Sequence, residues 1–200
     1  MKHSPEQSGF ALLISLIVVA AVISIGLAIL DLSIKQISLS TNSKQSEIAF
    51  HAANAGMECA HFWRREESDA MELGNNISPD CFGVNSDPVS VAPTDLGGLG
   101  DVAGDGEAFL YKYTFSWPSG TPDRCTSVTA LVASSTPLGV GTTVNNVETH
   151  VPGYPDGNSF VCESGSRCSV ISVRGYNYPC SAIAGGNTRG IVEREVLLQF

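Results

Sequence analysis

Six cysteines carry the clearest chemistry in this 200-residue chain. An even number of thiols favours disulfides in an oxidising compartment, and zinc binding is the alternative. No C-x-x-C spacing occurs and the four histidines do not stand at ligand spacing, which disfavours zinc. We therefore expect no metal and no cofactor, and we treat all six residues as disulfide candidates: Cys59, Cys81, Cys125, Cys162, Cys168 and Cys180.

The pairing of these cysteines is open among fifteen arrangements. We favour Cys59–Cys81, which would pin a helix to the loop after it, and Cys162–Cys168, which would close a hairpin. Cys125–Cys180 would then tie two distant strands together. The two local pairs have stronger support than the third.

A glycine-rich acidic segment, residues 94–107, places Asp101 and Asp105-Gly106 at a spacing that suggests a calcium loop. However, Ala103 fills an expected ligand position, and Lys112 stands where such a loop has its bidentate Glu. The segment also lacks a phosphate-loop pattern, and its acidic residues would repel phosphate. We expect a solvated loop.

Catalysis and nucleic-acid binding are both disfavoured. Lys and Arg total 11 against 20 Asp and Glu, a net charge of -9, whereas a general nucleic-acid binder has the opposite sign. There is no G-x-S-x-G or H-E-x-x-H motif. His51 and His61 fit surface or packing positions of a helix, and no nucleophile stands beside a base. We expect that the chain is not an enzyme and makes no contact with nucleic acid.

Residues 10–30 form an uncharged apolar run. As a helix it would rise roughly 31 Å, about the thickness of the hydrocarbon core of a bilayer. A secretory signal peptide has a shorter apolar region and ends at a cleavage site. This run instead continues without a proline into a polar segment. By the positive-inside rule, Lys2 and the terminal amine predict that the N-terminus lies in the cytoplasm. The simplest interpretation of the apolar run is a plain membrane anchor.

The helical pattern continues to about residue 72, where Gly74-Asn75-Asn76 predicts a break. Beyond residue 30 the apolar residues become a stripe, which predicts an amphipathic helix that packs on another layer. The stripe comprises Ile48, Ala52, Ala55, Cys59 and Phe62, broadened by Ala49, Ala53, Gly56, Ala60 and Trp63.

The remainder of the chain predicts short strands. Aromatic residues alternate with others over 109–117, which is typical of a strand with one aromatic face in a sheet core. Stacking on nucleic acid is the alternative, but such platforms lie in basic grooves. Residues 128–132, 170–174 and 192–200 predict three more strands. The fold class is therefore α+β, with a long N-terminal helix, membrane-spanning in its first half, packed on a C-terminal antiparallel sheet.

The junction Ser8-Gly9-Phe10 joins a short polar leader to the apolar run. It resembles the class III signal of type IV pilins. The resemblance implies that a prepilin peptidase cuts between Gly9 and Phe10 and then methylates Phe10. It also implies that the apolar helix is retained, first as a membrane anchor and then in the filament core. The expected regions are a leader (1–9), a transmembrane and filament-core helix (10–30), an amphipathic continuation (31–73) and a β-rich, disulfide-containing head (74–200).

A second segment, residues 47–58, is similar to the E-x-A-x-x-A-A-x-A-G-x-E stretch of PilX-like minor pilins, which often carry Glu where Asn54 stands here. Its small side chains also predict the close approach of a sheet or another helix. The strand after Gly-Asn-Thr-Arg (186–189) resembles PilX-like tails. The resemblance covers roughly residues 1–65 and the last dozen.

One position departs from the pilin pattern. Most pilins carry a Glu four residues after the methylated Phe, thought to pair with the terminal amine of a neighbouring subunit, but this chain has Ile14. An Ile cannot accept that contact. In lacking this Glu, the chain resembles GspK-like pseudopilins and some PilX-like minor pilins. This resemblance implies a minor subunit that primes assembly or caps the tip.

The resemblance implies three kinds of partner: other pilins or pseudopilins, the prepilin peptidase and the inner-membrane assembly machinery. It also implies a single-pass inner-membrane protein with a cytoplasmic N-terminus and a periplasmic head, later assembled into a pilus or pseudopilus. The alternative is a membrane-anchored periplasmic or surface binding protein.

Overall fold

The computed structural model describes residues 7–118, 123–186 and 190–200, with side chains from residue 10 onward. Most of the expected leader and three residues of the Gly-Asn-Thr-Arg tail motif therefore lie outside the described residues. The chain divides into two compact units, Met1–Lys44 and Gln45–Phe200. Helix α1 (Gln7–Glu66) contributes to both.

The predicted single helix to residue 72 is wrong in its last turn. Helix α1 ends at Glu66, and a short second helix, α2 (Ser68–Glu72), follows after Glu67 leaves helical geometry. The break has a physical reason: Arg64 and Glu72 form an ion pair with 2.6 Å between Nη2 and Oε1. In a straight helix, eight residues would separate them by about 12 Å along the axis.

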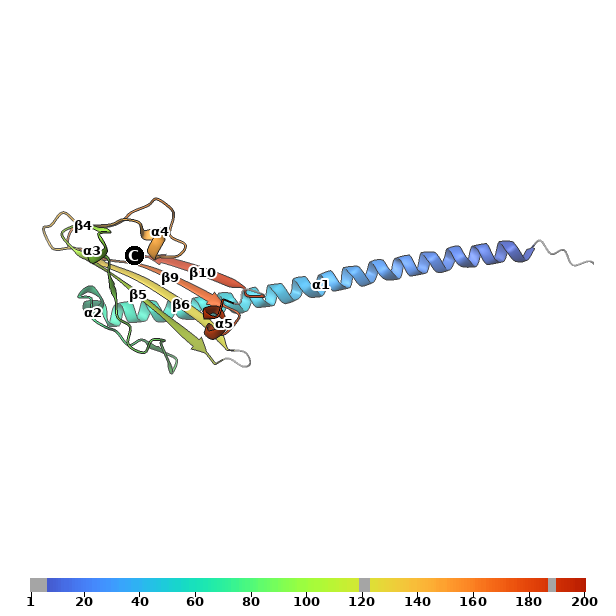
Figure 1. Cartoon of the computed structure of the whole chain (residues 1–200), viewed down its shortest axis with the longest axis horizontal. Helices are drawn as coiled ribbons and strands as arrows, with labels where there is room; N and C mark the ends of the chain where they lie inside the picture. Colours follow the sequence, from blue (N-terminus) through green and yellow to red (C-terminus); the bar gives the residue numbers. More distant parts are fainter. Residues whose placement is uncertain (1–6, 119–122, 187–189) are drawn as a thin grey trace, which may run out of the picture. The chain divides into compact units, whose positions relative to one another are not determined.

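The α+β fold class is confirmed, because residues 45–66 of α1 pack on an antiparallel five-stranded sheet (Figure 1). The strand order is β10-β9-β6-β5-β3. All four predicted strands are present. Three of them extend beyond their predicted bounds, and the fourth, 193–199, lies within the predicted range 192–200. The sheet consists of β3 (Thr94–Asp95), β5 (Glu107–Trp117), β6 (Arg124–Ser134), β9 (Arg167–Tyr176) and β10 (Glu193–Gln199).

A second layer on the opposite face of the sheet has no counterpart in the sequence prediction. It is a three-stranded sheet in the order β4-β7-β8 with short helices beside it. Its strands are β4 (Val102–Gly104), β7 (Thr142–Val144) and β8 (Phe160–Cys162), and the helices are α3 (Leu96–Leu99) and α4 (Val147–His150). A hairpin, β1 (Asp80–Cys81) and β2 (Val84–Asn85), and helix α5 (Cys180–Ala184) complete the described elements.

The two faces of the main sheet carry two separate cores. On the α1 side, the aromatic face of β5 is buried, as predicted, with Tyr111 and Phe115 fully enclosed. The Tyr111 hydroxyl donates to the Met71 carbonyl at 3.1 Å, and burial raises the pKa of Tyr111 to about 12. On the other face, Leu131 and Phe160 join the main sheet to the three-stranded layer.

The helix lies very close to the sheet because small residues meet on both sides. Gly56 of α1 packs against Thr126 and Val173, and Gly175 of β9 faces the backbone of α1. The Thr126 hydroxyl donates to the Ala52 carbonyl at 2.8 Å. The predicted stripe is therefore slightly rotated: its buried centre runs along Ala49, Ala53, Gly56 and Ala60, whereas Phe62 is 56% exposed.

This close approach predicts that Gly175→Ala destabilises the head. A Cβ at Gly175 would lie 2.9 Å from Cα of Ala53 and would also press on the Ala49 carbonyl, and neither backbone atom can move without displacing the helix. Overpacking of this kind costs about 1–3 kcal/mol. Denaturant unfolding of the full chain in detergent would measure the loss. Gly185→Ala is the control, because its Cβ would meet only ordinary contacts from 3.4 Å outward; equal effects of the two changes would contradict the packing argument.

The six cysteines form three disulfides, and they are the same three pairs that the sequence analysis favours: Cys59–Cys81, Cys125–Cys180 and Cys162–Cys168. Cys59–Cys81 joins α1 to β1. Cys125–Cys180 holds α5 over the end of β6. Cys162–Cys168 closes the connection between β8 and β9.

The acidic glycine-rich segment is more ordered than the predicted solvated loop, because it contains β3, α3 and β4. Its carboxylates make protein contacts. Asp101 accepts from Asn146 Nδ2 at 2.7 Å and lies 2.8 Å from His150 Nε2, and these contacts, with Asn146 foremost, lower the pKa of Asp101. Asp105 accepts from the hydroxyls of Ser135 and Thr136. Both acids therefore pin neighbouring loops of the second layer.

Candidate functional site: an apolar helix and a braced head

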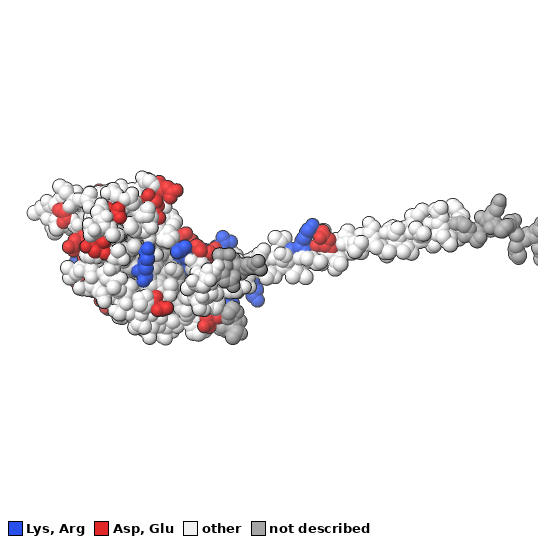
Figure 2. Space-filling model, viewed as in Figure 1, with Lys and Arg blue, Asp and Glu red and all other residues white. Residues whose placement is uncertain are grey.

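The first part of α1 is long and apolar enough to cross a membrane. Its most apolar 18-residue window has a mean hydropathy of 3.0, and none of that window is buried. Figure 2 shows this part of the helix as an uncharged surface with one small group of acidic and basic atoms. That group includes the ion pair of Asp31 and Lys35, whose carboxylate and ammonium are 2.8 Å apart. Charge thus begins where the uncharged run ends.

Three hydroxyl side chains along this part of α1 and just beyond it are bonded within the helix. The Ser15 hydroxyl donates to the Leu12 carbonyl at 2.8 Å, and Ser33 and Thr41 bond to the carbonyls four residues before them. Backbone and hydroxyl groups in lipid require internal partners. These bonds make the helix suited to an apolar surrounding.

The predicted processing residues, Gly9 and Phe10, both lie in the first turn of α1. Phe10 is 69% exposed, and Ile14 follows four residues later on the same helix face. Ile14 presents only a hydrocarbon side chain there. Cleavage and methylation at Gly9-Phe10 stay a prediction.

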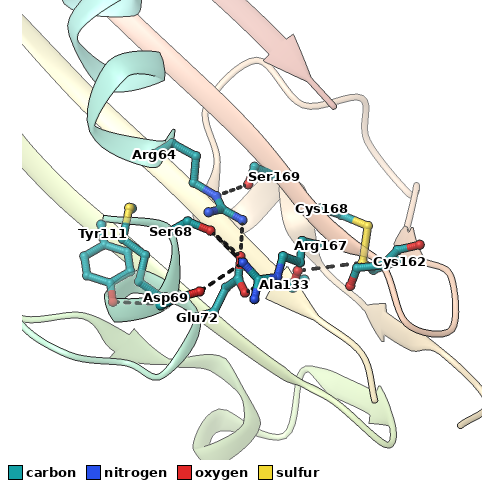
Figure 3. A network of polar contacts seen from close by, with 12 residues as sticks. Arg64, Ser68, Asp69, Glu72, Tyr111, Ala133, Cys162, Arg167, Cys168 and Ser169 are labelled. Atoms are coloured by element: carbon teal, nitrogen blue, oxygen red, sulfur yellow. Dashed lines mark hydrogen bonds and ion pairs between the residues drawn. A yellow bond between two sulfur atoms is a disulfide. The ribbon is translucent and has the colours of Figure 1, made fainter. Parts of the chain in front are cut away.

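The carboxyl end of α1 is anchored by a buried ion network that the sequence analysis missed (Figure 3). Arg64 is only 4% exposed; its Nε donates to Ser169 Oγ at 2.6 Å and its Nη2 to Glu72 Oε1 at 2.6 Å. Arg167 then bridges Glu72 and Asp69, with 3.0 Å to each carboxylate. The network joins α1, α2 and β9. The break of the helix near residue 67 could not be predicted without it.

Where α1 enters the head, amide and hydroxyl groups tie it to β9 and β10. Asn177 Nδ2 donates to Gln45 Oε1 at 3.0 Å, and Asn177 Oδ1 accepts from the Val192 amide at 2.7 Å. Arg194 donates to Ser46 Oγ from both Nε and Nη2. The contacts of Gln45 and Ser46 join residues that are more than a hundred positions apart in the chain, so no local pattern signals them.

The segment 47–58, singled out by its small residues, is the part of α1 that meets the sheet. Ala49, Ala53 and Gly56 are buried, while Glu47 and Glu58 are exposed. Asn54, at the position where PilX-like proteins often have Glu, is partly exposed. The resemblance and the close helix–sheet contact therefore rest on the same residues.

A single helix, α1, is apolar in its first part and packs on an antiparallel sheet with its last part. The architecture is pilin-like. The membrane-capable helix and the three disulfides indicate an extracytoplasmic, membrane-anchored protein. No protein-family model, curated protein or solved structure matches the chain.

Proposed function

We propose that this chain is a structural minor subunit of a type IV pilus or a related pseudopilus. The observation that carries the proposal is the uncharged run of α1, which begins at Phe10 directly after Gly9 and whose continuation packs on an antiparallel sheet. A helix of this kind can leave the bilayer only for another apolar surrounding, and a bundle of like helices supplies one. Its partners would be other pilins or pseudopilins, the prepilin peptidase and the inner-membrane assembly machinery.

Processing at the Gly9-Phe10 junction tests this proposal. Mass spectrometry of the mature protein from its native host should find N-methylated Phe10 at the amino terminus. An intact Met1, or a cut near residue 30, would contradict the pilin proposal and favour a plain anchored binding protein. Because the peptidase must fit a small residue, we expect Gly9→Leu to abolish processing and Gly9→Ala to retain part of it.

Ile14 supports a place at or near the filament tip. A subunit repeated along the shaft needs an acceptor for the terminal amine of its neighbour, since an unpaired amine in an apolar core is costly. Ile14 offers no acceptor, and a tip subunit has no subunit above it whose amine needs one.

The expected result is a few copies per filament, seen by immunogold labelling at one end. Deleting the protein should reduce filament number without changing the composition of the shaft, and Ile14→Glu should allow incorporation along it. Labelling along the whole shaft by the unaltered protein, or filaments assembled from it alone, would contradict the tip assignment.

A further inference from the structure

The face of the main sheet opposite α1 is only half covered. The three-stranded layer covers one end, and beside α5 the other end forms a cavity of about 490 Å³. Small-molecule sites typically occupy about 300–1,000 Å³. The polar side chains that line the cavity come from the β2–β3 connection, three strands of the main sheet and α5: Asp87, Thr114, Ser116, Ser127, Arg174 and Ser181.

The floor of this cavity offers side chains and not backbone groups. β6 pairs with β5 on one side and with β9 on the other along the whole stretch below it. The Asp87 amide donates to the Thr114 carbonyl at 2.9 Å and occupies the edge of β5 as well. A peptide could not bind here by strand addition, because the ladder already uses those backbone groups.

Most of the polar side chains that line the cavity carry hydroxyl groups. Among the described residues, Ser116, Ser127 and Ser181 have no hydrogen-bond partner for their hydroxyls. Each can both donate and accept. Such groups match a ligand whose own groups also do both.

The cavity is lined by one acidic and one basic side chain. Asp87 supplies a carboxylate and Arg174 a guanidinium. Glu193 of β10 lies 3.6 Å from Arg174 Nη1 and holds this guanidinium in position. Because Glu193 already neutralises Arg174, the guanidinium offers hydrogen-bond donors and no free positive charge, and the Asp87 carboxylate disfavours an anion. A polar neutral ligand can bond to both groups.

The remaining wall is apolar. Ile183 and Ala184 of α5 line the cavity together with the Cys125–Cys180 disulfide, which holds α5 in place. One apolar wall facing a polar floor suits the carbon face and the hydroxyl rim of a sugar ring.

We propose that this cavity binds a neutral saccharide of one or two units, with Asp87, Arg174 and the free serine hydroxyls holding the sugar hydroxyls. The site is separate from the apolar helix, so it can be tested independently of filament assembly. It gives the head a recognition surface whether the protein serves in a filament or as an anchored binder.

The test uses the full chain in lipid nanodiscs, since alkyl glucoside detergents would compete for the cavity. Maltose, lactose, cellobiose and diacetylchitobiose are titrated by calorimetry, with glucose 6-sulfate and triglycine as the charged and peptide probes. We expect at least one neutral disaccharide to bind. Asp87→Asn and Arg174→Met should each weaken it by about tenfold or more, the usual loss when a hydrogen bond to a charged group is removed. Lys112→Met is the matched control, because Lys112 lies exposed on the same sheet face outside the cavity.

Three results would overturn the proposal. The first is no binding of any neutral disaccharide. The second is binding that Asp87→Asn, Arg174→Met and Lys112→Met leave equally unchanged. The third is binding of only the sulfated sugar or only the peptide. None of them bears on the filament proposal, which depends on the mature N-terminus.

Discussion

Replacing Arg64 by Met should lower the free energy of unfolding by about 3–5 kcal/mol, the cost of breaking a buried ion pair from one side. Arg64 and Glu72 are both almost completely buried, and their side chains meet at 2.6 Å. Without Arg64, the described residues leave Glu72 only the more exposed Arg167 and the Ser68 hydroxyl as partners. The end of α1 would also lose its bond to Ser169.

Guanidinium chloride unfolding followed by the fluorescence of Trp63 and Trp117 measures this loss. The control is Arg65→Met, because Arg65 is exposed and the described residues include no ion-pair partner for it. We expect Arg65→Met to change stability by less than about 0.5 kcal/mol, as is usual for surface positions. Adding Glu72→Gln to Arg64→Met should recover part of the loss, since a neutral amide is less costly to bury than a carboxylate that has lost one of its two arginine partners. Equal effects of Arg64→Met and Arg65→Met would contradict a stabilising role for the network.

Removing the Cys125–Cys180 disulfide should cost about 4 kcal/mol, against about 2 kcal/mol for Cys162–Cys168, on the chain-entropy account of disulfide stabilisation. The difference arises because the first pair is separated by 55 residues and the second by only 6, so the first restricts the unfolded chain more. Replacing both cysteines of a pair by Ser avoids a stray thiol. Unfolding of the two double variants under the same conditions measures the order, and a larger loss for Cys162–Cys168 would refute it.

The elements long enough to repeat a buried face several times could be predicted from the sequence. The apolar run and the amphipathic stripe indicate α1, and the alternating aromatic residues of β5 indicate a strand with one buried face. Both patterns arise because a helix and a strand repeat their buried face at fixed intervals. The position of the stripe was less accurate, since Phe62 is large and apolar yet exposed, while Arg64, a charged residue, is buried.

The parts that were missed depend on contacts between distant residues. β4, β7 and β8 are three residues long each, which is too short for a periodic pattern. The break at Glu67 follows from the pairing of Arg64 with Glu72 and Ser169, and Ser169 lies 105 residues beyond Arg64. The cavity beneath α5 likewise combines Asp87, Arg174 and Ser181 from three separate segments. No spacing rule connects such positions.

The edge strand β10 could pair with the same strand of a neighbouring copy of the protein. Among the described residues it pairs only with β9, so its other side presents free backbone groups, a template on which another chain could form amyloid-like contacts. Its first three residues, Glu193, Arg194 and Glu195, are charged and exposed, and burying them against a second strand would require stripping their water. The apolar residues that follow lack this protection. We therefore expect the charged half of β10 to be the main barrier to edge-to-edge pairing between neighbouring copies.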